Sequence, residues 1–81
     1  MVGKFYVYIL ECADGSYYTG YTNDLDARLA RHNNGLASKY TRARLPVKIA
    51  WSKWCKCKGT AMQLEARIKG LTRKQKEGLV G

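Results

Sequence analysis

Tyrosines are concentrated near the start of the chain, where five of the six lie between positions 6 and 21. A phenol is unfavourable to bury unless its hydroxyl finds a hydrogen-bonding partner. Packing across neighbouring strands would account for any one of these rings. It does not account for the whole group, which makes this segment the first candidate for a chemical site: Tyr6, Tyr8, Tyr17, Tyr18 and Tyr21.

Positive charge is the second feature that points to chemistry. The chain has 15 Lys and Arg against 6 Asp and Glu, for a net charge of +9. The charge is uneven: residues 1–38 carry a net −1, and residues 39–81 carry +10. Such a charge on a small surface attracts polyanions. We therefore expect nucleic acid as the partner, with a plain solubilising surface as the alternative.

Length and composition limit the kind of protein. A chain of 81 residues makes one domain, residues 1–81. Hydrophobic residues are 46% of the chain and only one proline occurs, which excludes a disordered protein. No apolar stretch reaches the roughly 18 residues of a membrane-spanning helix, and no signal peptide is visible. We expect a cytoplasmic protein that does not bind membranes; the sequence does not indicate its oligomeric state.

Three segments have the composition or alternation of strands. Residues 4–11 and 17–22 are rich in aromatic and β-branched residues. Residues 47–54 alternate at period two, which predicts that Val47, Ile49 and Trp51 share one face.

The loop between the first two strands decides which tyrosines lie together. A two-residue turn would set Tyr8 opposite Tyr21 and send Tyr18 to the other face. A three-residue loop with Gly15 in the left-handed region would set Tyr8 opposite Gly20, with Tyr18 on the same face. Local turn chemistry permits both.

Helices are predicted after the second and third strands. Asn23 is the expected N-cap of a helix over 24–33, and residues 35–45 are expected to form a basic loop. Thr60–Gln63 has capping-box form before a helix over about 61–70, and Thr72–Gln75 repeats the form before a short helix ending near Gly78. The predicted order β-β-α-β-α-α makes an α+β domain.

Two short signatures resemble those of a known family. Tyr6-Val7-Tyr8, nine residues, and then Tyr18-Thr19-Gly20 resemble the paired motif of the GIY-YIG nuclease superfamily, with Tyr6 in the place of the first glycine. The similarity covers essentially the whole chain and is closest to the small, stand-alone bacterial members. Tyr21 departs from it, because many members have Lys there, and no late Asn is found. Further matching positions follow in the family's order: Asn23, Leu25, Arg28, His32, Lys39-Tyr40-Thr41 and Glu65.

This resemblance implies a fold and an activity. The implied fold is a small three-stranded antiparallel sheet flanked by helices. The implied activity is hydrolysis of phosphodiesters in DNA, including structured or damaged DNA, assisted by Mg²⁺ or Mn²⁺. A phosphodiester is anionic, so its hydrolysis needs positive charge on its oxygens and a base for the attacking water. The alternative is a binding module for DNA or RNA that retains the fold and cuts little.

The resemblance also assigns roles at matching positions. Glu65, the only acid between Asp26 and Glu77, would be the metal ligand. Arg28 would hold a phosphate with its planar fork. Tyr8 or Tyr18 would take the proton of the attacking water, and His32 would relay that proton or bind phosphate.

Substrate contacts complete the expected site. Gly20 would let the substrate backbone approach closely, and Asn23 is a further candidate for contact. For the site to form, Tyr8, Tyr18 and Gly20 must share a face, so the resemblance favours the three-residue loop. The basic half would bind the nucleic-acid backbone, with these main candidates: Lys39, Arg42, Arg44 and Lys74. The wider basic surface expected to follow the backbone also includes these residues: Lys53, Lys56, Lys58, Arg73 and Lys76.

Overall fold

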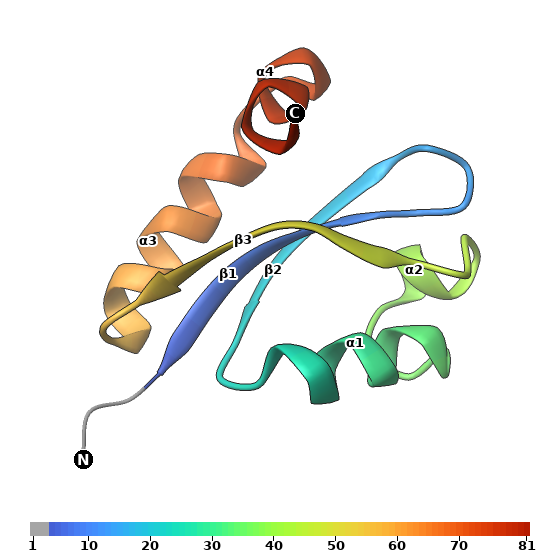
Figure 1. Ribbon diagram of the computed structural model, residues 1–81, viewed down its shortest axis with the longest axis horizontal. Coiled ribbons are helices and arrows are strands. Elements are labelled where there is room, and N and C mark those ends of the chain that lie inside the picture. Colours follow the sequence, from blue (N-terminus) through green and yellow to red (C-terminus); the bar gives the residue numbers. More distant parts are fainter. Residues whose placement is uncertain (1–3) are drawn as a thin grey trace.

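A computed structural model describes residues 4–81 as a three-stranded antiparallel sheet with helices on both sides (Figure 1). The strand order is β2-β1-β3, so β1 is central and β2 is an edge strand. The α+β class predicted from the sequence is confirmed. The elements, in chain order, are β1 (Phe5–Glu11), β2 (Tyr17–Thr22), α1 (Leu25–Asn33), α2 (Lys39–Arg42), β3 (Lys48–Cys55), α3 (Lys58–Lys69) and α4 (Arg73–Val80).

The hairpin between β1 and β2 has the three-residue loop. Cys12 N–H donates to the Ser16 carbonyl at 2.8 Å, and Gly15 has φ +83°. Only glycine adopts this left-handed conformation without steric cost. Tyr8 consequently pairs with Gly20, as the family resemblance required.

The sheet separates two hydrophobic cores. On one face of β1, Val7 and Ile9 pack with Ala61 and Ile68 of α3. On the other face, Tyr8 and Leu10 pack with side chains of α1. Figure 1 shows α3 and α1 on opposite sides of the sheet. Groups from both layers can therefore meet only around an edge of the sheet.

Strand β3 contradicts the predicted alternation. The register shifts between Ile9 and Leu10, which pair with Trp51 and Ile49 respectively, so Ala50 is an extra residue. An extra residue of this kind is a β-bulge, and each side chain beyond it points to the opposite face of the sheet from the one that strict alternation predicts. Val47 and Ile49 therefore pack beside α1, whereas Trp51 packs on the α3 side.

Several predicted helix boundaries are also wrong. The N-cap of α1 is Asp24, not Asn23, since the Asp24 carboxylate accepts from Ala27 N–H at 3.0 Å. The basic loop over 35–45 contains the one-turn helix α2. Helix α3 begins at Lys58 after an N-cap at Cys57, ahead of the expected capping box.

The final helix agrees better with its sequence signal. Thr72 and Gln75 form the predicted capping box at the start of α4, which continues past Gly78 to Val80. Within residues 4–81, no helix is both long enough and apolar enough to span a bilayer.

Candidate active site

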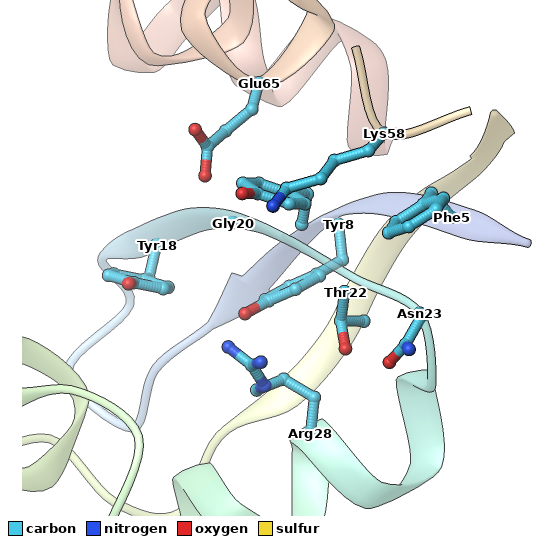
Figure 2. Close-up of a pocket in the computed structure, with 10 residues that line it drawn as sticks. Phe5, Tyr8, Tyr18, Gly20, Thr22, Asn23, Arg28, Lys58 and Glu65 are labelled. Carbon is cyan, nitrogen blue, oxygen red and sulfur yellow. The ribbon is translucent and has the colours of Figure 1, made fainter. Parts of the chain in front are cut away.

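A pocket of about 490 Å³ wraps around the exposed edge of β2 (Figure 2). One wall comes from β1, β2 and α1, and the other comes from α3 on the opposite side of the sheet. Six of its ten lining residues were predicted from the sequence: Tyr8, Tyr18, Gly20, Asn23, Arg28 and Glu65. The other four are Phe5, Tyr21, Thr22 and Lys58.

Gly20 allows the Tyr8 phenol to reach this edge. The Tyr8 ring extends from the central strand across Gly20, its partner on β2. A Cβ atom at position 20 would lie 2.5 Å from Tyr8 Oη and 2.7 Å from Cζ. The glycine is thus required by the protein's own tyrosine, whereas the sequence had suggested close approach of the substrate.

Replacing Gly20 by Ala should therefore destabilise the fold. The rigid, 2% exposed Tyr8 ring would have to leave its position. We expect Gly20→Ala to lower the free energy of unfolding by about 1–3 kcal/mol, measured by urea denaturation. Gly59→Ala is the matched control, because a Cβ at this helical glycine meets nothing within 4 Å. In the Gly59→Ala control the free energy of unfolding should rise by roughly 0.5–1 kcal/mol, because alanine favours a helix more than glycine does. Equal stabilities for the two variants would contradict the packing explanation.

A hydrogen-bond chain runs inward from the pocket through Tyr8 and His32. Tyr8 Oη lies 3.0 Å from His32 Nε2, and His32 Nδ1 lies 2.9 Å from Thr41 Oγ1. The Thr41 hydroxyl donates a hydrogen bond to the Ser38 carbonyl oxygen at 3.3 Å. Thr41 must then accept from His32 Nδ1–H, which leaves Nε2 as the acceptor of the Tyr8 proton.

His32 is therefore internal and does not line the pocket. Its side chain is 1% exposed, so of the two roles expected for His32 the structure does not place it for direct contact with phosphate. Tyr18 packs its ring against His32 edge to face, with the centroids 5.2 Å apart. The two tyrosines thus hold the imidazole from the pocket side.

Burial controls the protonation of this pair. Burial raises the pKa of Tyr8 to about 12, although the nearby Arg28 charge acts in the opposite direction. Burial, and then the Arg28 charge, lowers the pKa of His32 below its ordinary value of 6.5. At neutral pH the resting pair is consequently a neutral phenol that donates to a neutral imidazole.

The depressed histidine pKa predicts acid sensitivity of the fold. Below about pH 6.5 the unfolded chain binds a proton at His32 that the folded chain does not yet hold. We expect the free energy of unfolding to fall as the pH drops from 6.5 through the lowered folded-state pKa. Urea denaturation between pH 7.5 and 5 measures this, and His32 is the only histidine in the chain. A stability that stays level over this range would contradict the buried neutral imidazole.

Arg28 and Glu65 approach the pocket from opposite sides. In Figure 2 the Arg28 guanidinium points toward the Tyr8 hydroxyl, and the Glu65 carboxylate points into the pocket from α3. Glu65 also pairs with Lys69 at 3.7 Å, one helical turn along. A single carboxylate thus faces a guanidinium and a phenol across the edge of β2.

The donors present suit one kind of metal ion. Glu65 is the only acid lining the pocket, and residues 4–81 contain no group of three or more His, Cys, Asp or Glu able to hold a metal. Zinc sites generally use three or four protein ligands. Mg²⁺ typically keeps several waters and uses one or two carboxylates with a substrate phosphate. The pocket therefore fits Mg²⁺ or a similar hard cation.

Four predicted substrate contacts lie outside this pocket: Lys39, Arg42, Arg44 and Lys74. Arg44 is already engaged, because its guanidinium pairs with Asp14 at 3.1 Å and donates to the Tyr40 carbonyl at 2.8 Å. The other three side chains are exposed. They can contact only parts of a nucleic acid that extend beyond the pocket.

Lys58 was expected only among the cations that follow the nucleic-acid backbone, and the structure places it in the lining of the pocket. It lies in the first turn of α3, and Figure 2 shows its side chain directed toward the pocket. Tyr21 in place of the usual Lys indicated that one phosphate or base contact is missing or replaced. Nothing local to residue 58 distinguished it from its basic neighbours.

One family model matches most of this chain, and several known proteins are similar to it. The family model described as "GIY-YIG catalytic domain" matches residues 4–78. A UPF0213 protein of Streptococcus pneumoniae is 55% identical over 74 residues, which cover 91% of this chain and 75% of the relative. A UPF0213 protein of Halobacterium salinarum is 51% identical over 74 residues, which cover 91% of this chain and 96% of the relative.

Two solved structures are also similar. The solution NMR structure of the UPF0213 protein BH0048 from Bacillus halodurans has a TM-score of 0.61 at 48% identity, covering 95% of this chain and 82% of that one. The solution NMR structure of EF2693 from E. faecalis has a TM-score of 0.63 at 41% identity, covering 96% and 85%.

Proposed function

The chain belongs to the GIY-YIG catalytic domain family, and from this membership and its pocket we propose that it is a divalent-metal-dependent endonuclease acting on DNA, including structured or damaged DNA. One observation carries the proposal. A phenol hydrogen-bonded to a buried imidazole, a guanidinium and a single carboxylate face one another around the edge of β2. These are the groups that hydrolysis of a phosphodiester requires.

Cationic side chains would hold the scissile phosphate. The Arg28 fork matches two phosphate oxygens, and Lys58 adds a second positive charge from α3. Since Lys58 projects from the opposite layer, it can occupy the role that a Lys after the second signature has in other members. Both charges are already positioned before the substrate arrives, so they need little reorganisation during the reaction.

Tyr8 and His32 would move the proton of the attacking water. The raised pKa of Tyr8 argues against a preformed phenolate. Instead, Tyr8 Oη accepts a proton from water while its own proton passes to His32 Nε2 along the existing 3.0 Å hydrogen bond. An anionic phosphate in the pocket favours this transfer, because negative charge nearby stabilises the imidazolium. Tyr18 supports the imidazole through its edge-to-face contact.

Glu65 is the residue that would hold Mg²⁺ or Mn²⁺. When bound, the ion supplies positive charge to the non-bridging oxygens of the phosphate. The exposed basic residues of the C-terminal half would bind the backbone of the substrate on either side: Lys39, Arg42 and Lys74.

The alternative is a nucleic-acid-binding module, for DNA or RNA, that retains the fold and cuts little. The specific observation in its favour is the Tyr8 pKa of about 12, which makes the phenol reluctant to lose its proton. Tyr21 in place of the usual Lys is a second point in its favour.

A cleavage assay separates the two functions. Purified protein is incubated with nicked, branched and single-stranded DNA and with RNA, in Mg²⁺ and in EDTA. We expect cutting of at least one DNA substrate that requires the metal. Binding in gel-shift assays without cutting of any substrate, at any metal concentration, would instead establish the binding module.

A further inference from the structure

A second pocket, of about 210 Å³, lies farther along the exposed edge of β2. Its lining comes from three places in the chain: Ser16 and Tyr17 where β2 begins, Tyr40 of α2, and Arg73 and Lys76 of α4. Residues 17 and 20 are three strand positions apart, which is about 10 Å. The second pocket is therefore close enough to receive a nucleotide next to the scissile phosphate.

An aromatic contact joins the two pockets. Tyr18, which lines the first pocket, stacks on Tyr40 of the second, with ring centroids 6.1 Å apart and planes inclined by 26°. The Arg44 guanidinium carbon lies 3.9 Å from the Tyr40 ring centroid. Tyr40 as a residue nevertheless remains 38% exposed, so a ligand would reach the part that Tyr18 and Arg44 leave uncovered.

Cations accompany these rings. The Arg73 guanidinium carbon lies 5.2 Å from the Tyr17 ring centroid, and this guanidinium also pairs with Glu77, outside the pocket, at 3.5 Å. Lys76 also lines the pocket, and among residues 4–81 no carboxylate pairs with it. No acid lines the pocket. The lining thus combines two phenol rings with two positive charges.

We propose that this second pocket binds an unpaired nucleobase, so that the substrate presents a single-stranded segment beside the phosphate to be cut. The inference rests on the proposed function and specifies its substrate class. Aromatic side chains interleaved with cations are typical of sites for single-stranded nucleic acid, where bases stack on rings and cations follow the backbone. A paired base cannot enter such a pocket without leaving its stack.

Binding measurements without metal test this proposal. Fluorescence anisotropy in EDTA gives the affinity for single-stranded DNA, single-stranded RNA and duplex DNA. We expect Tyr40→Leu to weaken single-strand binding about tenfold while duplex binding stays nearly constant. Tyr40→Phe should bind like the unmodified protein, because it keeps the ring. Trp54→Leu is the matched control: Trp54 is 52% exposed and lies on β3, at the other edge of the sheet.

A second measurement uses the unmodified protein, so it does not depend on the folding of a variant. Single strands carrying the fluorescent base 2-aminopurine at successive positions should be quenched on binding at one or two positions. Replacing that same position by an abasic site should weaken binding about tenfold. The DNA and RNA arms show which sugar the pocket accepts.

Three results would overturn the inference: equal loss of single-strand and duplex affinity in Tyr40→Leu, no quenching at any position, or no binding of single strands. Each is distinguishable from failure of the proposed function. That failure is the absence of metal-dependent cutting, whatever the base preference.

Discussion

Glu65→Gln should reduce metal-dependent DNA cleavage about 10³-fold or more. Glutamine keeps the size of the side chain but removes the negative charge, and no other acid lines the pocket to hold a cation. The fold should be little affected, because the pair that Glu65 forms with Lys69 is worth only about 0.3–0.5 kcal/mol. Initial cleavage rates at several Mg²⁺ concentrations, together with urea denaturation, measure both effects.

Glu11→Gln provides the control. Glu11 also forms a surface ion pair, with Lys48 at 3.6 Å, but it lies on β1 and outside both pockets. Its cleavage rate should stay within a factor of about two, since a surface ion pair contributes little. If the two glutamine variants cut equally well, Glu65 is only a helix-surface residue and the metal assignment is wrong.

Arg28→Lys should lower the cleavage rate about 10²-fold even though it preserves the positive charge. Lysine offers a point charge instead of a planar fork, so it cannot bind two phosphate oxygens in the same way. Arg28 also reaches toward the Tyr8 hydroxyl in Figure 2, a position that the shorter side chain should not fill equally. Single-turnover cleavage at saturating protein isolates this effect from binding.

Arg31→Lys tests whether the loss is specific. Arg31 lies on the same helix, is exposed and does not line the pocket. The Arg31→Lys variant should cut DNA at the same rate as the unmodified protein. A similar loss in both variants would mean that α1 contributes only general positive charge, and the role of Arg28 at the phosphate would be withdrawn.

The hairpin shows how far local sequence determines this protein. Segments rich in aromatic and β-branched residues correctly predicted both strands, because such side chains fit the pleated, half-buried surface of a sheet. The pairing of Tyr8 with Gly20 was not determined by local rules, since two turns were acceptable. The family resemblance chose the three-residue loop, and the structure confirms it through Gly15 at φ +83°.

The third strand shows where such prediction fails. Its alternation predicted that Trp51 shares a face of the sheet with Val47 and Ile49. Because of the bulge at Ala50, Trp51 instead packs against the core on the other face. An extra residue is tolerated there because both faces of the sheet are covered by helices, so either side can bury an apolar ring. Period-two patterns cannot reveal this, since they assume an unbroken register.

The sequence by itself determined the fold class, the two signatures and the excess of positive charge in residues 39–81. Only the tertiary structure decided that His32 is buried behind Tyr8, that Lys58 joins the pocket, and that Arg44 is occupied by Asp14. The physical reason is that the site forms around an edge strand. Its groups come from layers on opposite sides of the sheet, and their meeting depends on how α1 and α3 pack, which no local sequence pattern encodes.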